Sequence, residues 1–289
     1  MAIIITIFLC LLLFLLLGFR LVAYLFRWLE ISNRPDYNPP SINSFPSFCG
    51  HLSFAVIWAA LIESLSSIIM VVLLLAAWLR KLMCRCFHVK NQSLTDSRIP
   101  VIVLVPGYLM NDGCMWVLRW RLVRDGFTVR VFEPVDKMSS IDNQARRLGE
   151  FIDTTINGDP TLTLIGHSMG GLVCRQYVAK YSYGLPTVNR LITLGTPHRG
   201  TKLWSAGIGA VVRDLRPGSP FLVQLEEFSV GQYPPQRLSI ASDFDELVIP
   251  NEHADYPDAE HRRVHLVGHF RLVLSARVYE LIQQYLKKS

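Results

Sequence analysis

The pentapeptide Gly166-His-Ser168-Met-Gly170 constrains the fold of this chain more than any other segment. It follows a short apolar run at 162–165 and precedes a segment, 170–181, with the residue spacing of a helix. Between a strand and a helix, Gly-x-Ser-x-Gly forms a turn too tight for side chains at its two glycine positions. The turn lifts the Ser168 hydroxyl above the sheet edge. We therefore expect Ser168 to be a nucleophile, with the backbone N–H of Met169 as one donor of an oxyanion hole.

The sequence around this turn predicts a mostly parallel, doubly wound α/β sheet. Short apolar runs, which are typical of strands buried on both faces, alternate with segments of helical spacing. About 190 residues take part, enough to bury one core. The predicted strands are 99–105, 128–132, 162–165, 188–194, 237–241 and 264–267, and the predicted helices are 141–156, 170–181 and 278–286.

The nucleophile needs a base, and histidine is the residue that we expect in that role. A serine hydroxyl reacts poorly until a base accepts its proton. In sheets of this kind the acid and then the base follow the nucleophile, at the ends of later strands. His269 comes directly after a predicted strand and a glycine, whereas His265 lies within that predicted strand. We favour His269 and keep His265 as the alternative.

The acid and the second oxyanion donor are predicted in the same way, from the ends of strands. Three carboxylates, those of Asp243, Asp245 and Glu246, follow the predicted strand at 237–241. The acid must accept a hydrogen bond from the imidazole, and we favour Asp245 for this role. The loop after the strand at 99–105 supplies the second donor, for which the N–H of Tyr108 is preferred to that of Leu109.

Five motifs in a fixed order carry a resemblance to a known family: Val103-Leu-Val-Pro-Gly-Tyr-Leu-Met-Asn, Gly166-His-Ser-Met-Gly-Gly-Leu, Leu194-Gly-Thr-Pro-His-Arg-Gly-Thr, Asp245-x-x-Val-x-Pro and Gly268-His. Together they resemble the bacterial lipase/esterase branch of the α/β-hydrolase superfamily, and they are also similar to inositol-deacylase-like lipases. The resemblance covers about residues 99–286. It implies the α/β-hydrolase fold and the hydrolysis of carboxylic esters through an acyl-enzyme.

The resemblance also implies residue roles. Ser168, Asp245 and His269 would form a catalytic triad, and Met169 and Tyr108 would be the oxyanion donors. It does not fix the substrate. An acyltransferase with the same triad, or a membrane scaffold without activity, would be the alternatives.

Two long apolar segments precede the predicted sheet. Hydrophobic residues make up 51% of the chain and charged residues 18%, against about 25% charged in average soluble domains. We expect membrane-spanning helices at about 2–29 and 52–79, which form an anchor over residues 1–90 before a catalytic domain at 91–289. Lys and Arg around the two segments give conflicting indications of orientation. The two segments predict an integral membrane protein, and the resemblance to the bacterial lipase/esterase branch implies the bacterial inner membrane. The side of the catalytic domain is left open.

Glu63 lies inside the second apolar segment. A carboxylate in hydrocarbon is costly and is by default a functional hypothesis. The alternative, which we favour, is that the span begins near residue 61 and leaves Glu63 at the interface. Anchoring beside a bilayer predicts lipid esters as substrates, by proximity alone.

Partners other than the membrane and an ester are not indicated. The net charge of +6 falls mostly in the first 90 residues, and no basic stripe with interleaved aromatic residues is present, so we expect no nucleic-acid partner. The six cysteines have no zinc-like spacing, and His261, His265 and His269 lie in a predicted strand and turn, so we expect no metal and no cofactor. The oligomeric state is left open.

The segment at 201–235 follows Thr196-Pro-His198-Arg-Gly200 and combines apolar residues with Gly and Pro. We interpret it as a lid or acyl-binding cap over Ser168, with ordinary helical packing as the alternative. His198 is expected to support the site structurally and not to react.

Overall fold

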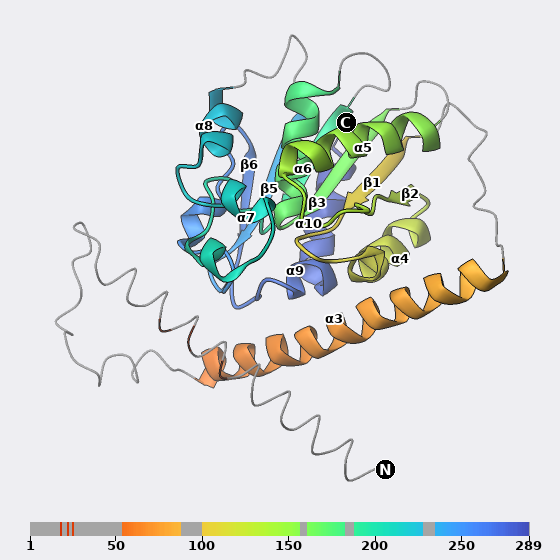
Figure 1. Cartoon of the computed structure of the whole chain (residues 1–289). Helices are drawn as coiled ribbons and strands as arrows, with labels where there is room; N and C mark the ends of the chain where they lie inside the picture. The colour runs from red at the N-terminus through yellow and green to blue at the C-terminus, as the bar shows by residue number, and fades with distance from the viewer. Residues whose placement is uncertain are drawn as a thin grey trace.

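A computed structural model describes residues 54–87, 100–156, 161–182, 188–227 and 235–288, together with the helical positions Gly18, Val22 and Leu25. Its centre is a six-stranded sheet in the order β2-β1-β3-β4-β5-β6, with every neighbouring pair parallel (Figure 1). The parallel sheet predicted from the sequence is confirmed. The strands are β1 (Val101–Val105), β2 (Thr128–Val131), β3 (Leu162–His167), β4 (Val188–Leu194), β5 (Gln236–Ser242) and β6 (Glu260–Val264).

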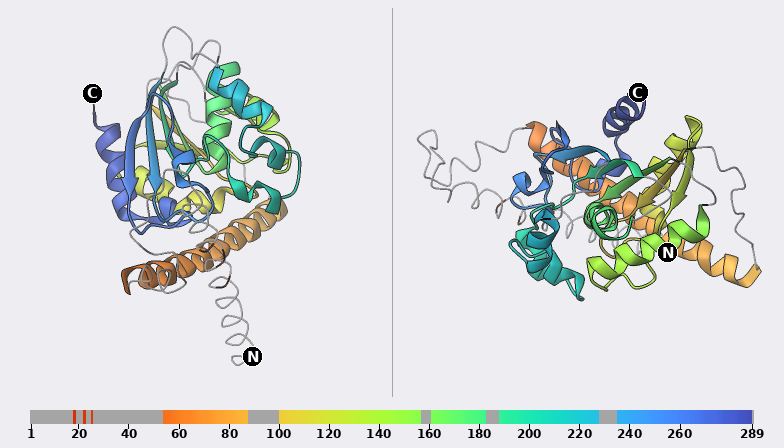
Figure 2. Two further views of the ribbon diagram at one scale, coloured as in Figure 1. Left: turned by 90° about the vertical axis from the view of Figure 1, so that its left-hand side faces the viewer. Right: turned by 90° about the horizontal axis from the view of Figure 1, so that it is seen from above.

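Helices cover both faces of the sheet (Figures 1 and 2). One face packs against α5 (Ile141–Thr155), α6 (Met169–Lys180), α7 (Val211–Asp214) and α8 (Pro220–Glu227). The other packs against α4 (Trp116–Arg124), α9 (Arg271–Leu274) and α10 (Ala276–Leu286). Three short 3-10 helices complete the described elements: η1 (Asp112–Met115), η2 (Lys202–Ala206) and η3 (Asn251–Ala254).

The apolar run of β1 shows why the sheet is buried on both sides. Val103 packs into the core beneath α5 and α6, whereas Leu104 packs into the core beneath α4 and α10. Successive side chains of a strand point to opposite faces, so a strand between two helical layers needs apolar residues at every position.

The sequence-based prediction was wrong for the last strand. β6 ends at Val264, where the predicted strand 264–267 begins. β6 is an edge strand whose residues 261–263 are exposed and polar. The apolar residues that suggested a strand instead form the turn toward His269.

The helix α3 (Phe54–Phe87) lies across the edge of the sheet at which the strands end (Figures 1 and 2). It contacts η1, which follows β1, and α9, which follows β6. Asn111 Nδ2 donates to the Leu74 carbonyl oxygen at 2.9 Å, and Arg80 and Lys81 each form an ion pair with Asp112 at 2.7 Å. α3 therefore packs on the α/β unit along most of its length.

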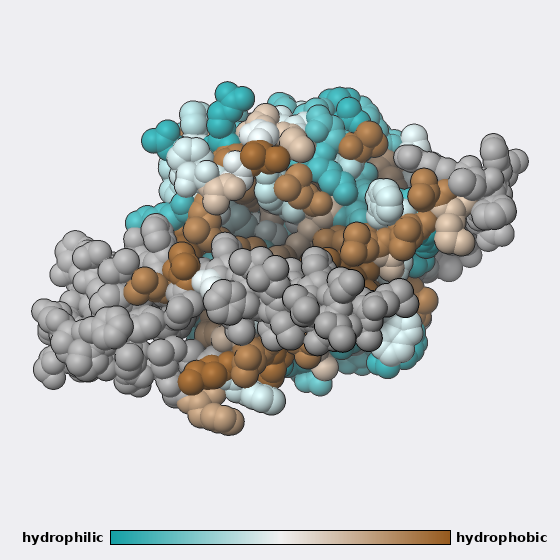
Figure 3. Space-filling model, turned by 60° about the horizontal axis from the view of Figure 1, so that its bottom comes forward, coloured by the Kyte–Doolittle hydropathy of each residue, from teal (hydrophilic) through white to brown (hydrophobic). Residues whose placement is uncertain are grey.

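The face of α3 that packs inward consists mostly of polar and small side chains, with Met70 as a large apolar exception, whereas the outward face is apolar. The buried residues include Glu63, Ser64, Ser66, Ser67, Ala59 and Ala77. Exposed large apolar side chains include Trp58, Leu61, Leu65, Ile69, Val72, Leu75 and Trp78, and Figure 3 views the molecule from this side.

The structure describes most of one predicted membrane segment and only three positions of the other. Within the described part of the chain, Ile57–Met83 of α3 is long and apolar enough to cross a membrane, with a mean hydropathy of 2.3. It overlaps the predicted segment at 52–79. The predicted segment at 2–29 lies outside the described residues, apart from its three helical positions.

Candidate active site

Ser168 occupies the sharp turn between β3 and α6. Its backbone has φ 55° and ψ −131°, a strained conformation for a residue with a side chain, and its N–H donates to the Leu194 carbonyl oxygen at 2.8 Å. A Cβ on Gly166 would lie 2.5 Å from Gly171 Cα, and one on Gly170 would lie 2.3 Å from Val105 O. Both glycines are thus required by close backbone contacts, as the motif predicts.

His269 and Asp245 form a buried hydrogen-bonded pair after β6 and β5. His269 Nδ1 lies 2.8 Å from Asp245 Oδ2 and 3.0 Å from Oδ1, and each side chain is only 1% exposed. The Asp245 carboxylate also accepts from the N–H groups of Leu247 at 2.8 Å and Val248 at 3.0 Å. These bonds fix the carboxylate, which in turn orients the imidazole.

The pKa values of Asp245 and His269 are shifted in opposite directions, as expected for a carboxylate that supports a basic imidazole. Burial alone would raise the pKa of Asp245, but His269 and the two backbone N–H groups hold that pKa below its ordinary value. Burial alone would lower the pKa of His269, but the Asp245 carboxylate, with Glu246 and Glu63, holds it above its ordinary value. The carboxylate therefore stays ionised while the imidazole gains affinity for a proton.

His167 connects Ser168 to this pair. The ring centroids of His167 and His269 are 4.8 Å apart, and His167 Nε2 donates to the His269 carbonyl oxygen at 3.1 Å. Burial, with the nearby His269, lowers the pKa of His167 to about 3, so its ring is neutral. Ser168, the residue after His167, thus lies at the same sheet edge as the buried pair.

The two alternatives from the sequence contact each other instead. His265 Nδ1 bonds the Asp243 carboxylate, and the two side chains are 66% and 37% exposed. The structure therefore contains two His–Asp pairs, one buried and one on the surface. The preferred residues form the buried pair.

The loop after β1 lies directly against Ser168. A Cβ on Gly107 would be 3.0 Å from Ser168 Cβ, which places the next residue, Tyr108, close to Ser168. The Tyr108 hydroxyl donates to the Ile208 carbonyl oxygen at 2.6 Å and accepts from the Ile208 N–H at 2.8 Å. Met169 is the first residue of α6. The loop that carries Tyr108 is thus tied to the segment interpreted as a lid.

Three residues near the site have contacts that the sequence did not reveal. Glu246 Oε2 accepts from the backbone N–H of His269 at 3.1 Å. Glu63 Oε1 accepts from the N–H groups of Phe270 at 2.9 Å and Arg271 at 3.3 Å. The third residue is His167, described above. These contacts join segments far apart in the chain, so local patterns do not disclose them.

His198, which the sequence analysis expects to support the site, is buried and bonded to other side chains. Its Nδ1 lies 3.1 Å from Arg175 Nη1, its Nε2 lies 3.0 Å from Thr193 Oγ1, and its ring stacks on Tyr256. Within the described residues, no group of three or more His, Cys, Asp or Glu could hold a metal ion.

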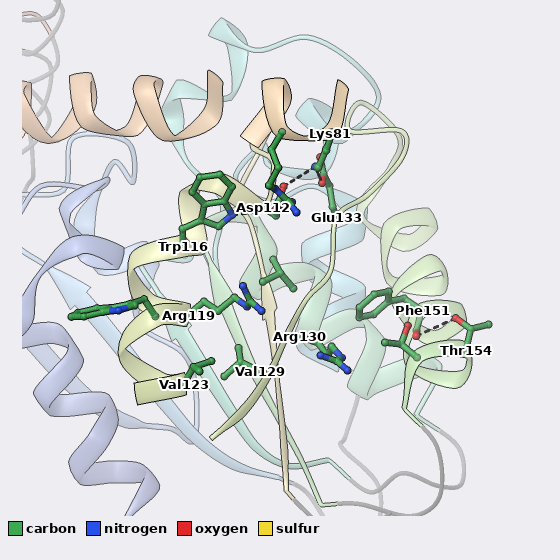
Figure 4. A pocket seen from close by; sticks show the side chains of 14 residues that line it. Lys81, Asp112, Trp116, Arg119, Val123, Val129, Arg130, Glu133, Phe151 and Thr154 are labelled. Atoms are coloured by element: carbon green, nitrogen blue, oxygen red, sulfur yellow. Dashed lines mark hydrogen bonds and ion pairs between the residues drawn. The ribbon is translucent and has the colours of Figure 1, made fainter. Parts of the chain in front are cut away.

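A groove of about 840 Å³ lies elsewhere, at the β2 side of the sheet (Figure 4). Its lining combines the C-terminal part of α3 with α4, β2 and α5, and includes Lys81, Arg119, Arg130 and Glu133. No member of the predicted triad lines it.

Comparisons with known proteins agree with this architecture. A family model described as a PGAP1-like alpha/beta domain matches residues 136–210. The GPI inositol-deacylase of Coccidioides immitis (strain RS) is 51% identical over 41 residues, which are 14% of this chain and 4% of that protein. The match therefore spans a small part of both chains.

Solved structures resemble a much larger part of the chain. Bacillus licheniformis lipase BlEst2 in its mature form has a TM-score of 0.54 and 18% identity, covering 68% of this chain and 96% of the lipase. The lin2722 gene product of Listeria innocua has a TM-score of 0.53 and 16% identity, with coverages of 66% and 95%. Aspergillus fumigatus lipase B has a TM-score of 0.52 and 17% identity, with coverages of 67% and 54%. The chain thus shares the α/β-hydrolase fold of these structures.

Proposed function

We propose that this protein is a membrane-anchored serine hydrolase that cleaves carboxylic esters, with lipids as the substrate class. The observation that carries the proposal is the buried His269–Asp245 pair, whose imidazole lies 4.8 Å from the ring of His167, the residue before the strained Ser168 turn. Ser168 Oγ attacks the ester carbonyl carbon while His269 accepts the hydroxyl proton. The N–H groups of Met169 and Tyr108 stabilise the negative charge that develops on the carbonyl oxygen.

The remaining steps return the site to its starting state. The tetrahedral intermediate collapses, and the C–O bond to the alcohol breaks as His269 gives its proton to the leaving oxygen. Water then attacks the acyl-Ser168 ester with His269 again as base, which releases the acid and restores the hydroxyl. Asp245 stays ionised throughout and stabilises the imidazolium.

The membrane part of the proposal rests on α3. Its outer face is apolar, while its polar face packs on the catalytic domain near the residues that follow β1 and β6. This packing keeps Glu63 out of hydrocarbon and holds the ester site close to the bilayer surface. A bacterial inner membrane is the location that the resemblance in the sequence favours.

Labelling with a fluorophosphonate tests the proposed chemistry. These probes react with activated serines, so detergent-solubilised wild-type protein should be labelled and Ser168→Ala should not. Active protein would then be compared on a short soluble ester and on phospholipid and acylglycerol esters. A folded wild-type protein without labelling would refute the serine-hydrolase proposal, and hydrolysis confined to soluble esters would refute the lipid substrate class.

Membrane association gives a separate prediction. Because large apolar side chains cover the outer face of α3, we expect the protein to stay with membranes in alkaline carbonate and to dissolve only in detergent. Membrane fractionation followed by immunoblotting measures this. Release by carbonate alone would contradict an anchor.

Tyr108→Phe tests the connection between the oxyanion loop and the 201–235 segment. The variant keeps the Tyr108 N–H but loses both hydrogen bonds to Ile208, at a net cost of about 1 kcal/mol. We expect kcat/KM to fall about fivefold, since 1.36 kcal/mol corresponds to tenfold. If the segment is a lid over the acyl chain, the loss is larger for long-chain than for short-chain esters. Equal, unchanged rates on both substrates would contradict the lid interpretation.

A further inference from the structure

The segment that carries His269 is held by three side chains from different parts of the chain. His167 donates to the His269 carbonyl oxygen, and Glu246 accepts from the His269 N–H. Glu63 accepts from the next two backbone N–H groups, those of Phe270 and Arg271. Two of these side chains come from the catalytic domain itself, whereas Glu63 comes from the apolar helix α3.

Glu63 fits this place closely. Its side chain is 0% exposed, and a Cβ on Gly268 would lie 2.2 Å from both Glu63 Cγ and Cδ. The carboxylate therefore lies directly against the backbone before His269, and only glycine at position 268 leaves room for it. Ser67 Oγ, one turn further along α3, donates to the Glu63 carbonyl oxygen at 3.1 Å.

A carboxylate at this place needs a physical reason. Burial of an ionised carboxylate costs several kcal/mol unless hydrogen bonds compensate it. For packing α3 on the domain, a buried apolar side chain such as that of Met70 would serve without this cost. Glu63 accepts from the two backbone N–H groups that follow His269, so an effect on His269 explains its charge.

We propose that Glu63 is a positioning residue for His269: it fixes the backbone at 269–271 and supplies negative charge that favours the imidazolium formed in the transition state. This inference rests on the proposed function and adds to it a role for the membrane-facing helix. The residue acts through His269 and takes no part in bond making or breaking.

The charged groups around His269 determine the expected pH dependence. The carboxylates of Asp245, Glu246 and Glu63 all raise the pKa of His269, and the ring of the neutral His167 lies 4.8 Å from its ring. The Arg271 guanidinium is directed elsewhere, because it donates to the Leu266 carbonyl oxygen. Loss of the Glu63 charge therefore lowers the pKa of His269. Activity needs the neutral imidazole, so the acid limb of kcat/KM moves to lower pH.

The test compares three variants of the full-length protein in detergent, on a soluble ester. Glu63→Gln keeps the size and an acceptor oxygen but removes the charge, whereas Glu63→Ala removes both. Ser66→Ala is the matched control, because Ser66 is buried on the same helix and its Oγ donates to the Ile62 carbonyl oxygen of α3 itself. The readouts are kcat, KM, the pH profile and the thermal unfolding midpoint.

We expect Glu63→Gln to lower kcat about tenfold, or 1.36 kcal/mol, with KM nearly unchanged and the acid limb at lower pH. Glu63→Ala should lower kcat about a hundredfold, because the His269 backbone is then also misplaced. Ser66→Ala should stay within about twofold of wild type, as substitutions outside key contacts do.

A folded Glu63→Gln variant with the wild-type kcat and acid limb would overturn the inference, even if Glu63→Ala fails to fold. Such a result with an inactive Ser168→Ala would leave the proposed function intact and remove only the role of Glu63. Wild-type activity in Ser168→Ala would instead refute the proposed function itself.

Discussion

Replacing Ser168 with alanine is expected to abolish ester hydrolysis, with kcat falling by roughly 10⁶-fold, the loss seen when the nucleophile of a serine triad is removed. The backbone N–H groups of Met169 and Tyr108 remain in place, so a small activity above that of water is retained. Alanine has the same Cβ as serine, and the strained backbone at φ 55° is therefore no more costly than before.

The measurement is steady-state hydrolysis of a soluble ester, with thermal unfolding to show that the variant is folded. Ser182→Ala is a suitable control, because Ser182 lies just beyond the C-terminal end of α6 and its Oγ bonds the Val178 carbonyl oxygen. The control should keep wild-type activity. If Ser168→Ala hydrolysed the ester at a rate close to wild type, another group would be the nucleophile.

The residues around Ser168 were predictable because local sequence determines their geometry. A turn between a buried strand and a helix places its serine by backbone constraints alone, and the glycine contacts of Gly166 and Gly170 satisfy those constraints. The strand at 188–194 was predicted at its observed limits because its C-terminal half, residues 191–194, is buried between two helical layers and is mostly apolar. The turn at Ser168 and the strand at 188–194 can be predicted because both depend on residues that are close together in the sequence.

Other features depend on contacts that no local pattern contains. β6 is an edge strand with exposed Arg262 and Arg263, and its polar residues do not give the apolar pattern of a buried strand. The apolar residues after it give that pattern, so the sequence predicts the strand there. α4 was not predicted because its nine residues include three arginines around only two buried leucines, Leu118 and Leu122.

Glu63 is the clearest example of a residue whose contacts cannot be predicted from the local sequence. In the sequence Glu63 is a charged residue within an apolar run, and this pattern favours a position at the membrane interface. Its hydrogen bonds reach residues more than 200 positions later in the chain. These contacts with the α/β unit, and not the hydropathy of α3, determine where its carboxylate lies.

Asp245→Asn is the second change with a large expected effect. If the proposed triad operates, kcat falls about 10⁴-fold, as in a serine-protease triad that loses the acid charge. The amide keeps the shape of the carboxylate, so the fold should persist. It offers an N–H in place of one carboxylate oxygen, and the imidazole can then take the wrong tautomer with its proton on Nε2. Loss of the charge also lowers the pKa of His269, because the Asp245 carboxylate raises it. The acid limb of kcat/KM should therefore move to lower pH.

Asp243→Asn is the matched control, since it makes the same chemical change two residues away. Asp243 bonds His265 in a pair that is exposed to solvent, where a hydrogen-bonded ion pair contributes about 0–1 kcal/mol. Its loss should leave kcat within about fivefold of wild type. If instead Asp243→Asn were inactive and Asp245→Asn active, the exposed His265–Asp243 pair would be the catalytic one. Ser168 would then have to reach His265, and the buried pair would be a structural contact.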